Sequence, residues 1–294
     1  MAYFDERYKK ICPDFEPEKP EERSIRINTL CADEKKVVAR LEAEEVMLTK
    51  QPIPNSYAFT AEFSISSTTE HLLGYFYMQG LASQCVAHVL APQEGWTIID
   101  MAAAPGSKTT HIAQLMNNTG RILALDKKSD RLNALRNNCE RLGVSNVIAI
   151  RKDSRYATDL KIKADGVLLD APCSGNYCGE EDWGEKRLIY DIQTNARVQR
   201  EMLKTASMIV KDGGVIVYST CSLEPEEDEL VIDYAVKKLG LVVEETGLPK
   251  ELNTSPGITS WENTELDPSL AKTARFWPHK TKTEGFFVAK LRKK

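Results

Sequence analysis

The sequence predicts an α/β protein whose main part is a doubly wound, mostly parallel sheet, preceded by a small N-terminal α/β domain. Two observations predict this fold class. From residue 95 onwards, short apolar runs typical of strands alternate with helical segments, whereas the first 66 residues are rich in prolines and charges. Strands that are joined through helices run parallel and have both faces covered, which agrees with their continuous apolar character.

The N-terminal part contains three predicted elements and one longer helical segment. Alternating apolar residues predict a strand over 24–30, and apolar residues on one face predict a helix over 33–45. A second strand is expected over 59–65. The segment 69–90 has a helical pattern rich in apolar and aromatic residues, so we expect it to pack against the following domain.

The larger domain is expected over residues 93–294, after an N-terminal region over 1–92. Its predicted strands occupy residues 96–100, 121–126, 147–150, 167–170, 215–218 and 285–289. Open α/β sheets bind ligands at the carboxyl ends of their strands. The residues that follow these strands are therefore the candidates for a functional site.

Composition bounds the class of protein. Hydrophobic residues make up 42% and charged residues 28%, which is ordinary for a globular protein. No apolar run approaches the ~20 residues needed to cross a bilayer, and the charged start shows no signal peptide. Seven cysteines without disulfide-like spacing favour a reducing compartment, so a cytoplasmic protein is expected. No paired Cys or His spacing occurs, so no metal site is expected.

The distribution of charged residues indicates whether the protein can bind nucleic acid. A net charge of −4 argues weakly against nucleic acid, but residues 272–294 contain eight Lys or Arg and one Glu. Residues 121–163 are also rich in basic side chains. A basic footprint of this kind permits phosphate binding, and a solvated basic surface is an equally good interpretation.

Two cysteine motifs follow predicted strands. The first is Asp170-Ala-Pro-Cys173-Ser-Gly and the second is Ser219-Thr-Cys221-Ser. Two thiols at strand ends, one of them three residues after an aspartate, suit covalent chemistry on a cytosine ring. There a thiolate adds to carbon 6 and makes carbon 5 nucleophilic. A free cysteine is more commonly a small buried hydrophobe, but the polar neighbours of Cys221 argue against that interpretation.

A third strand end carries a turn of small residues, Asp100-Met-Ala-Ala-Ala-Pro-Gly-Ser-Lys108. Small residues let the backbone approach a ligand, and the helix that follows offers free N–H groups. The glycine patterns of NTPases and dinucleotide-binding proteins are absent. Asp126 ends the next strand and suits ribose hydroxyls, while Asp153 suits an adenine amino group. Together they predict an adenosyl ligand, unless Asp126 merely caps the next helix.

These motifs resemble those of the RNA 5-methylcytosine methyltransferase family, the NOL1/NOP2/Sun group, and its compact archaeal tRNA enzymes in particular. The resemblance extends from Arg26-Ile-Asn28 to the last strand. It implies a Rossmann-like class I methyltransferase fold, with the catalytic domain over 93–294 and RNA recognition by 1–92. It also implies S-adenosylmethionine as the cofactor. Some relatives carry a PUA-type RNA-binding domain, and the space between Leu30 and Gln79 is too short to hold one.

The resemblance assigns roles to site residues. It implies Cys221 as the nucleophile and Cys173 as the group that assists proton removal and product release. It implies that Asp170 stabilises the protonated base at ring nitrogen 3 and that Lys108 pairs with Asp170. The implied cofactor contacts are Ala102, Ala103, Ala104, Pro105, Gly106, Ser107, Lys108, Asp126, Arg131, Asp153 and Asp170. The family usually has Cys at position 102 and Gly at 107, and neither difference removes a needed side chain.

Candidate RNA contacts come from three places. Arg26 and Asn28 match an N-terminal motif of the family and are expected to contact RNA backbone or base. The loop 176–183 departs from the family and is expected to border the target base, where Tyr177 or Trp183 would stack on it or pack a lid.

The third place is the aromatic and basic run 275–280, which suits phosphate contact and stacking. Core packing of Phe276 and Trp277 is an equally good interpretation of this run. The acidic run 223–229 is expected to be structural, because carboxylates favour the N-terminal end of the helix that follows it.

The sequence thus predicts a monomeric tRNA cytosine-5 methyltransferase that forms a covalent Cys221–cytosine adduct and needs neither metal nor membrane. Ribosomal RNA is the alternative substrate. A non-catalytic RNA-binding module is less favoured because both Cys173 and Cys221 are present. A DNA cytosine-5 enzyme would carry a glutamate motif that is not found, and an amino-group methyltransferase would need no thiol.

Overall fold

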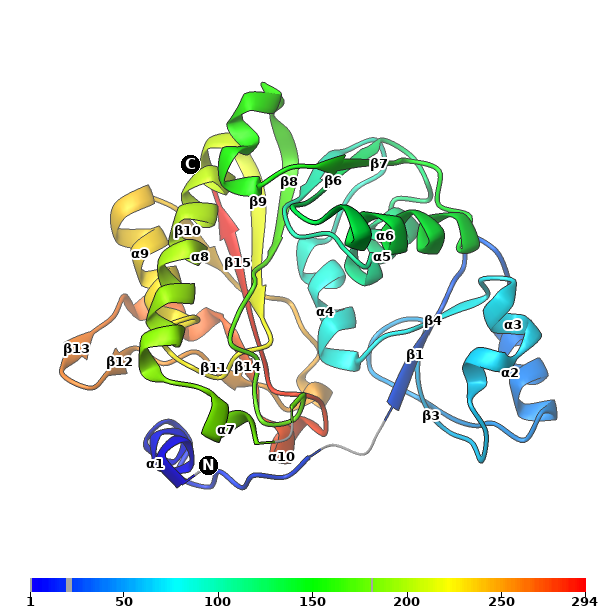
Figure 1. The fold of residues 1–294 in the computed structure, drawn as a ribbon, viewed down its shortest axis with the longest axis horizontal. Helices are drawn as coiled ribbons and strands as arrows, with labels where there is room; N and C mark the ends of the chain where they lie inside the picture. Colours follow the sequence, from blue (N-terminus) through cyan, green and yellow to red (C-terminus); the bar gives the residue numbers. More distant parts are fainter. Residues whose placement is uncertain (1, 20–22, 181) are drawn as a thin grey trace.

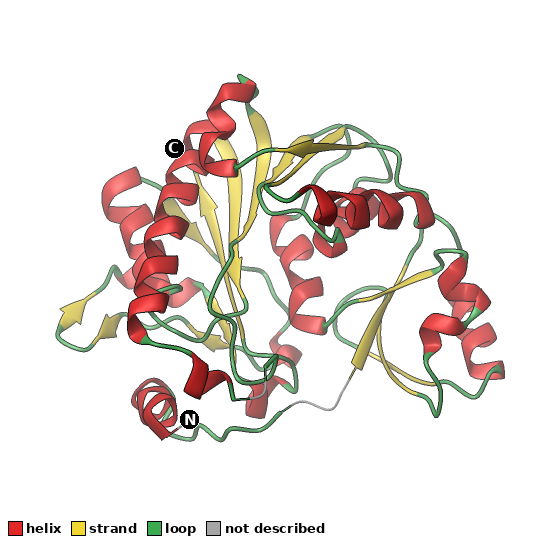
Figure 2. Ribbon diagram, viewed as in Figure 1, coloured by secondary structure: helices red, strands yellow, loops and turns green. Residues whose placement is uncertain are grey.

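The computed structural model describes residues 2–19, 23–180 and 182–294, which form a large and a small sheet with their helices (Figures 1 and 2). Within these residues the larger sheet has the order β11-β14-β15-β9-β8-β5-β6-β7, with β10 also paired to β15. Its parallel strands are β5 (Thr97–Asp100), β6 (Arg121–Asp126), β7 (Val147–Arg151), β8 (Ala164–Asp170) and β9 (Val210–Thr220). Its antiparallel strands are β10 (Val242–Glu244), β11 (Ser255–Pro256), β14 (Ala274–Phe276) and β15 (Phe286–Arg292). This confirms the predicted doubly wound α/β sheet.

Helices cover both faces of this sheet because its central strands are apolar and buried on both sides. Ile98 of β5 belongs to one cluster and its neighbour Ile99 to the other, both fully buried. The first cluster joins α4 (Leu81–Leu90) and α5 (Ser107–Leu115) to the sheet. The second joins α8 (Ile189–Ile209) and α9 (Glu229–Leu239) to it, and α6 (Ser129–Arg141) covers the outer strands β6 and β7.

The small sheet is antiparallel throughout and has the order β2-β3-β1-β4. Its strands are β1 (Arg23–Ile27), β2 (Met47–Lys50), β3 (Ser56–Thr60) and β4 (Phe76–Met78). The predicted helix is present as α2 (Glu34–Ala43), where the Asp33 side chain caps the first turn by accepting from the Lys36 N–H.

The single helical segment expected over 69–90 is wrong. The chain instead forms α3 (Thr69–Leu72), then β4, then α4. Gly74 separates the first two with a φ of +72°, and a Cβ there would lie 1.8 Å from the carbonyl oxygen of Arg141. Only glycine fits such a left-handed turn pressed against a neighbouring helix.

The first helix, α1 (Ala2–Ile11), was not expected from the proline-rich and charged N-terminal sequence. It lies beside α7 (Trp183–Lys186) and α10 (Pro278–Thr281), far along the chain (Figure 1). Phe4 and Tyr8 of α1, with Phe15 after it, pack on Trp183 and Trp277 in one aromatic cluster. The N-terminal segment is therefore attached to the larger sheet rather than to the small one.

The remaining elements are short. They are η1 (Ile65–Ser67), η2 (Ser154–Leu160), η3 (Lys250–Leu252), η4 (Pro268–Lys272) and the hairpin of β12 (Ser260–Trp261) and β13 (Thr264–Glu265). Across the described ranges, none of the helices has the length and apolar character required to cross a membrane.

Candidate active site

The two cysteine motifs meet because their strands are neighbours. β8 and β9 are parallel, with Asp170 opposite Ser219, so the loops after both strands leave the same edge of the sheet. The Cys173 and Cys221 sulfur atoms lie 2.9 Å apart, within reach of an S–H···S hydrogen bond. Cys221 is exposed and Cys173 is half-buried. The structure thus brings the two predicted thiols together, with one of them open to a substrate.

An ion pair borders the thiols. The Lys108 ammonium Nζ lies 2.8 Å from Asp170 Oδ2, and the Ser219 hydroxyl donates to Asp170 Oδ1 at 2.7 Å. Both carboxylate oxygens therefore have a donor, which fixes the orientation of Asp170. The expected pairing of Lys108 with Asp170 is present.

The thiol pair is electrostatically asymmetric. The hydrogen bond from Cys173 stabilises a thiolate on Cys221, which lowers the pKa of Cys221 and raises the pKa of Cys173. The positive Lys108 also acts on Cys221 and favours its charged form. Of the two thiols, Cys221 is therefore the one that ionises first, while Cys173 keeps its proton.

The acidic run after Cys221 is buried, which corrects the expectation of a helix-terminal role alone. Glu224, Glu227, Asp228 and Glu229 are all shielded from solvent. Glu227 accepts from the Ser174 N–H at 3.0 Å and from the Ser174 hydroxyl at 2.6 Å. The run therefore ties the loop of Cys221 to the loop of Cys173. Sequence reasoning missed this because acidic runs are normally solvated.

The basic partner of this run is Arg275, which was a candidate RNA contact. Its guanidinium is buried, binds Glu229 with Nε 2.5 Å from Oε1, and donates to the Leu223 carbonyl at 3.0 Å. Phe276 and Trp277 are also buried. RNA contact by these three side chains is therefore wrong, and the core-packing interpretation holds.

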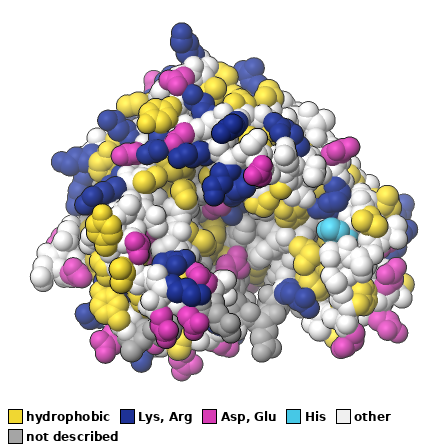
Figure 3. Space-filling model, viewed as in Figure 1, with side chains coloured by type: hydrophobic (Ala, Val, Ile, Leu, Met, Phe, Trp, Pro, Cys, Tyr) yellow, Lys and Arg dark blue, Asp and Glu magenta, His cyan; other side chains and the backbone are white. Residues whose placement is uncertain are grey.

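The C-terminal basic stretch is largely ion-paired as well. Five of its eight basic residues have a carboxylate within 4.0 Å, namely Arg275, Lys280, Lys282, Arg292 and Lys293. It therefore offers less free positive charge than the sequence suggests. Figure 3 instead shows Lys and Arg side chains spread over the middle and upper part of one face of the molecule.

The divergent loop 176–183 packs inward, although residue 181 lies outside the described residues. Tyr177 and Trp183 are buried in the aromatic cluster with Phe15, so their predicted stacking on a base is wrong and both side chains pack into the protein instead. The Asn176 amide donates to the carbonyls of Cys221 at 2.7 Å and Gly285 at 2.8 Å. This amide connects the loop of Cys221 with the start of β15.

The small-residue turn before α5 is stabilised by a buried hydrogen bond between the end of β5 and the first turn of α5. The buried Asp100 accepts from the Thr109 hydroxyl at 2.7 Å, and burial raises the pKa of Asp100 to about 6. Gly106 has a φ of +107°, and a Cβ there would lie 2.7 Å from Leu135 Cδ1. Ser107 begins α5 and keeps regular helical geometry, so the serine at this position is accommodated.

Asp126 lies at the end of β6, next to this turn. Its carboxylate accepts from the Lys128 N–H at 2.8 Å and lies 3.4 Å from Arg131 Nη1, while Arg131 also binds the Ala104 carbonyl. The α6 N-cap is Lys128, without a side-chain cap, so Asp126 does not serve as the helix cap. Asp153 binds Arg155 through both oxygens, at 3.1 and 2.8 Å. The carboxylate of Asp126 and the turn 102–106 fit an adenosyl group on adjacent strand ends.

Arg26 and Asn28 are buried, so their predicted contact with RNA is wrong. The Arg26 guanidinium donates to the Ser107 carbonyl at 3.1 Å and the Thr110 hydroxyl at 3.0 Å. The Asn28 amide donates to the Leu142 carbonyl at 2.9 Å. Both side chains attach the small sheet to α5 and α6, and Arg26 does so at the turn itself.

Glu284 is a site residue that sequence reasoning missed. Its carboxylate interacts with the Lys108 ammonium and lies close to the start of α4, where a Cβ on Gly80 would be 2.6 Å from it. Burial raises the pKa of Glu284. The stretch Thr-Glu-Gly before an apolar strand carried no pattern that would have marked this residue.

Comparison with known proteins places this arrangement in a family. Residues 87–292 match the family described as 16S rRNA methyltransferase RsmB/F. The chain belongs to the RsmB/F methyltransferase family. The tRNA (cytosine(72)-C(5))-methyltransferase of Pyrococcus horikoshii is 44% identical over 251 residues, which cover 85% of this chain and 58% of that protein. The chain therefore spans less than two thirds of the length of this relative.

Two further RsmB/F-like proteins cover more of the chain. The tRNA (cytosine(49)-C(5))-methyltransferase of Pyrococcus abyssi is 37% identical over 286 residues, which cover 94% of this chain and 89% of that protein. The crystal structure of NSun6 from P. horikoshii with SFG superposes with a TM-score of 0.81 at 32% identity, covering 94% of this chain and 91% of that one. The likeness confirms the predicted class I methyltransferase fold.

Proposed function

We propose that this RsmB/F family member is an S-adenosylmethionine-dependent RNA cytosine-5 methyltransferase that acts on tRNA. The observation that carries the proposal is the contact between Cys173 and Cys221 next to the Asp170–Lys108 pair. A thiolate and a thiol side by side serve two successive steps on one base, whereas methyl transfer to an amino group needs neither.

The cofactor assignment rests on the turn 102–108 and on Asp126. These residues fit an adenosyl group, and the solved NSun6 structure holds SFG on the same fold. We assign Asp126 to the ribose hydroxyls, with Arg131 and Asp153 on the adenosyl part. When bound, S-adenosylmethionine supplies the methyl group that carbon 5 of cytosine attacks.

The first step belongs to Cys221. Its thiolate adds to carbon 6 of the cytosine, forming an S–C bond, and the electron pair of the 5,6 double bond becomes available at carbon 5. Asp170 lies beside the sulfur and is held by Ser219 and Lys108, so it can stabilise the protonated nitrogen 3 of the activated ring. Carbon 5 would then bond to the methyl group while the bond from that methyl to the sulfonium sulfur breaks, and S-adenosylhomocysteine would leave.

The second step belongs to Cys173. Carbon 5 now carries a hydrogen and a methyl group, and loss of that proton allows the S–C6 bond to break and the 5,6 double bond to re-form. The sulfur of Cys221 is uncharged while it is bonded to carbon, so it no longer raises the pKa of Cys173. Cys173 can then lose its own proton to solvent. The resulting thiolate takes the proton from carbon 5, the 5,6 double bond re-forms, and Cys221 leaves as a thiolate.

The substrate class rests on the two archaeal relatives, both of which are named as tRNA enzymes. We propose that the N-terminal region over 1–92 recognises the RNA and that the domain over 93–294 performs catalysis. The family description favours ribosomal RNA as the second candidate. Incubation with labelled methyl donor and either total tRNA or 16S rRNA distinguishes them: 5-methylcytosine in tRNA alone supports the proposal, and in rRNA alone it overturns the tRNA assignment.

Replacing Lys108 by methionine should raise the pH at which Cys221 becomes reactive. The thiolate is the reactive form, so alkylation by iodoacetamide increases as pH rises through the pKa of Cys221, which lies below the usual value of 9. Without the ammonium, the remaining negative charge of Asp170 raises that pKa further. Mass spectrometry of Cys221 alkylation against pH measures the midpoint.

The matched control for Lys108→Met is Lys50→Met. Lys50 also forms a 2.8 Å ion pair with a carboxylate, that of Glu34, but it belongs to the small sheet. Its replacement should leave the midpoint unchanged. An unchanged midpoint in the Lys108 variant itself would contradict the electrostatic role given to Lys108.

Replacing Asp126 by asparagine should weaken binding of S-adenosylhomocysteine by about tenfold or more, that is by ~1.4 kcal/mol at least. Asparagine keeps an oxygen for the Lys128 N–H, so the turn should persist, while the charged acceptor for ribose hydroxyls is lost. Isothermal titration calorimetry measures the affinity. Asp130→Asn, in the first turn of α6, is the control and should bind normally.

A further inference from the structure

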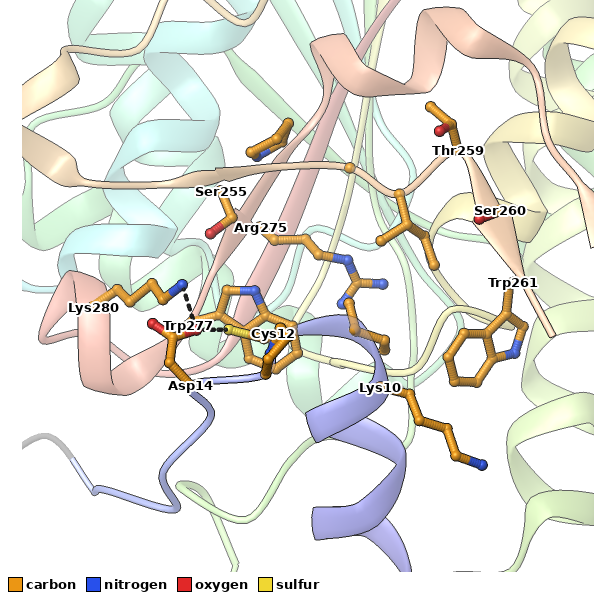
Figure 4. A pocket seen from close by; sticks show the side chains of 15 residues that line it. Lys10, Cys12, Asp14, Ser255, Thr259, Ser260, Trp261, Arg275, Trp277 and Lys280 are labelled. Atoms are coloured by element: carbon orange, nitrogen blue, oxygen red, sulfur yellow. Dashed lines mark hydrogen bonds and ion pairs between the residues drawn. The ribbon is translucent and has the colours of Figure 1, made fainter.

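A cluster of three metal-ligating side chains lies away from the active site, where the N-terminal segment meets α10. Cys12 and Asp14 follow α1, and His279 belongs to α10. One ligand atom from each residue lies within 4.8 Å of the other two. Figure 4 shows Cys12 and Asp14 side by side, next to Trp277 and Lys280.

The distances suit a small divalent ion. Cys12 Sγ lies 3.8 Å from His279 Nε2 and 3.1 Å from Asp14 Oδ1. Ligand atoms around a tetrahedral zinc ion are about 3.5 Å apart, because Zn–S and Zn–N bonds are about 2.3 and 2.0 Å long. The two observed separations bracket that value, so only small side-chain movements would close the site.

The histidine is prepared for this role by its surroundings. Its Nδ1 atom is buried and has no hydrogen-bond partner among the described residues, whereas Nε2 faces the Cys12 sulfur. The Nε2 atom is thus the one that can bind.

We propose that Cys12, Asp14 and His279 form a Zn²⁺ site with one position open to solvent. Thiolate, imidazole and carboxylate groups are the ligands that zinc binds in proteins, whereas harder cations bind oxygen ligands. This ligand set therefore favours zinc. Cys12 is only 4% exposed whereas Asp14 is exposed, so the open position lies on the outer side of the cluster. The expectation of no metal site relied on short spacings, but His279 follows Cys12 by 267 residues.

In the absence of metal, the ammonium group of Lys280 forms an ion pair with the carboxylate of Asp14. Its ammonium lies 2.9 Å from Asp14 Oδ1 and compensates the carboxylate charge. Zinc would replace this ammonium and the thiol proton of Cys12, which is released on binding. The thiolate and carboxylate together then balance the two charges of the ion, and Lys280 turns to solvent.

The site would fasten two distant segments to each other. His279 lies five residues before Glu284, which interacts with Lys108, and six before Gly285, whose carbonyl binds Asn176 in the nucleophile loop. A metal at residue 279 would therefore fix the N-terminal segment against the connection that leads into the active site. The inference does not depend on the proposed methyltransferase function.

Cobalt titration tests the site, since Co²⁺ bound to a thiolate gives an absorption band in the near ultraviolet. The titration uses the full chain with Cys173→Ala and Cys221→Ala, which removes the other close sulfur pair. We expect a one-to-one thiolate band that Zn²⁺ displaces. Adding Cys12→Ser or His279→Gln should abolish it, whereas adding Cys31→Ser, which removes an exposed thiol elsewhere, should leave it intact.

Lys280→Met provides a second, independent measurement. Removal of the competing ammonium should increase the apparent Co²⁺ affinity severalfold, whereas a merely structural change would leave it unchanged or lower it. Absence of the thiolate band, its persistence in the Cys12→Ser variant, or unchanged or weaker binding by the Lys280→Met variant would overturn the proposal. A misfolded variant is recognised by its thermal unfolding midpoint without metal, which should match that of the parent chain.

Discussion

Replacing Cys221 by alanine abolishes methyl transfer to RNA, with an expected loss on the order of 10⁴-fold or more, as for other covalent nucleophiles. Without this sulfur nothing adds to carbon 6, and carbon 5 of cytosine stays a poor nucleophile however well the base is placed. No other thiol can take over: Cys173 is the nearest sulfur, but it is half-buried and burial adds to the rise in its pKa. Transfer of labelled methyl groups to tRNA measures the loss.

The control for the Cys221 variant is Cys31→Ala, which removes another exposed thiol and should retain full activity. The Cys221 variant should still bind S-adenosylhomocysteine with unchanged affinity, because the turn 102–106 and Asp126 are held by Thr109, Arg131 and the Lys128 N–H. Loss of cofactor binding would show instead a damaged fold. Activity within tenfold of the parent chain would exclude Cys221 as the nucleophile.

The sequence predicts the central sheet well because its strands are apolar on both faces. Each of the six expected strands is present, and β5 and β6 lie within one residue of their predicted bounds. The site residues were predictable for the same reason. They follow buried strands directly, so the position of Cys173, Cys221 or Asp126 depends on strand order and not on long-range packing.

The parts that the sequence does not predict depend on partners distant in the chain. The run from Glu224 to Glu229 has the composition of a solvated helix start, yet it is buried because Arg7, Arg275 and the Ser174 hydroxyl supply compensating donors. No local pattern records these pairings. Arg26 is a positively charged example of the same effect. It is buried because a carbonyl and a hydroxyl group of α5, distant in the sequence, accept its hydrogen bonds.

The buried carboxylates also explain why two surface loops can hold two reactive sulfurs 2.9 Å apart. Loops that carry functional groups need a rigid support to keep catalytic geometry. Here Glu227 binds the backbone of the Cys173 loop, and Asn176 binds the backbone of the Cys221 loop. The burial of charge is therefore best understood as a requirement of the site, because buried ion pairs contribute little net stability to a fold.

Replacing Cys173 by alanine should leave the first step intact and block the second. The variant loses the hydrogen bond from Cys173 that lowers the pKa of Cys221, so addition becomes slower near neutral pH, but Lys108 still favours the thiolate and Cys221 can still add to carbon 6. The methyl group is therefore transferred once. The carbon 5 proton then has no base, and the S–C6 bond cannot break. We expect a protein–RNA adduct that survives denaturation, in a yield approaching one per active site, with multiple turnover reduced by about 10²-fold or more.

Three comparisons distinguish this trap from a simple loss of activity. Omission of the methyl donor should prevent the stable adduct, because addition of the thiolate alone is reversible. The double variant Cys173→Ala and Cys221→Ala should form no adduct, which shows that the linkage goes through Cys221. The Cys178→Ala variant, which lacks a half-buried thiol of the same loop, should turn over normally. Normal turnover by Cys173→Ala would mean that another group removes the proton, and Asp170, whose charge acts on Cys221, would then be the residue to replace.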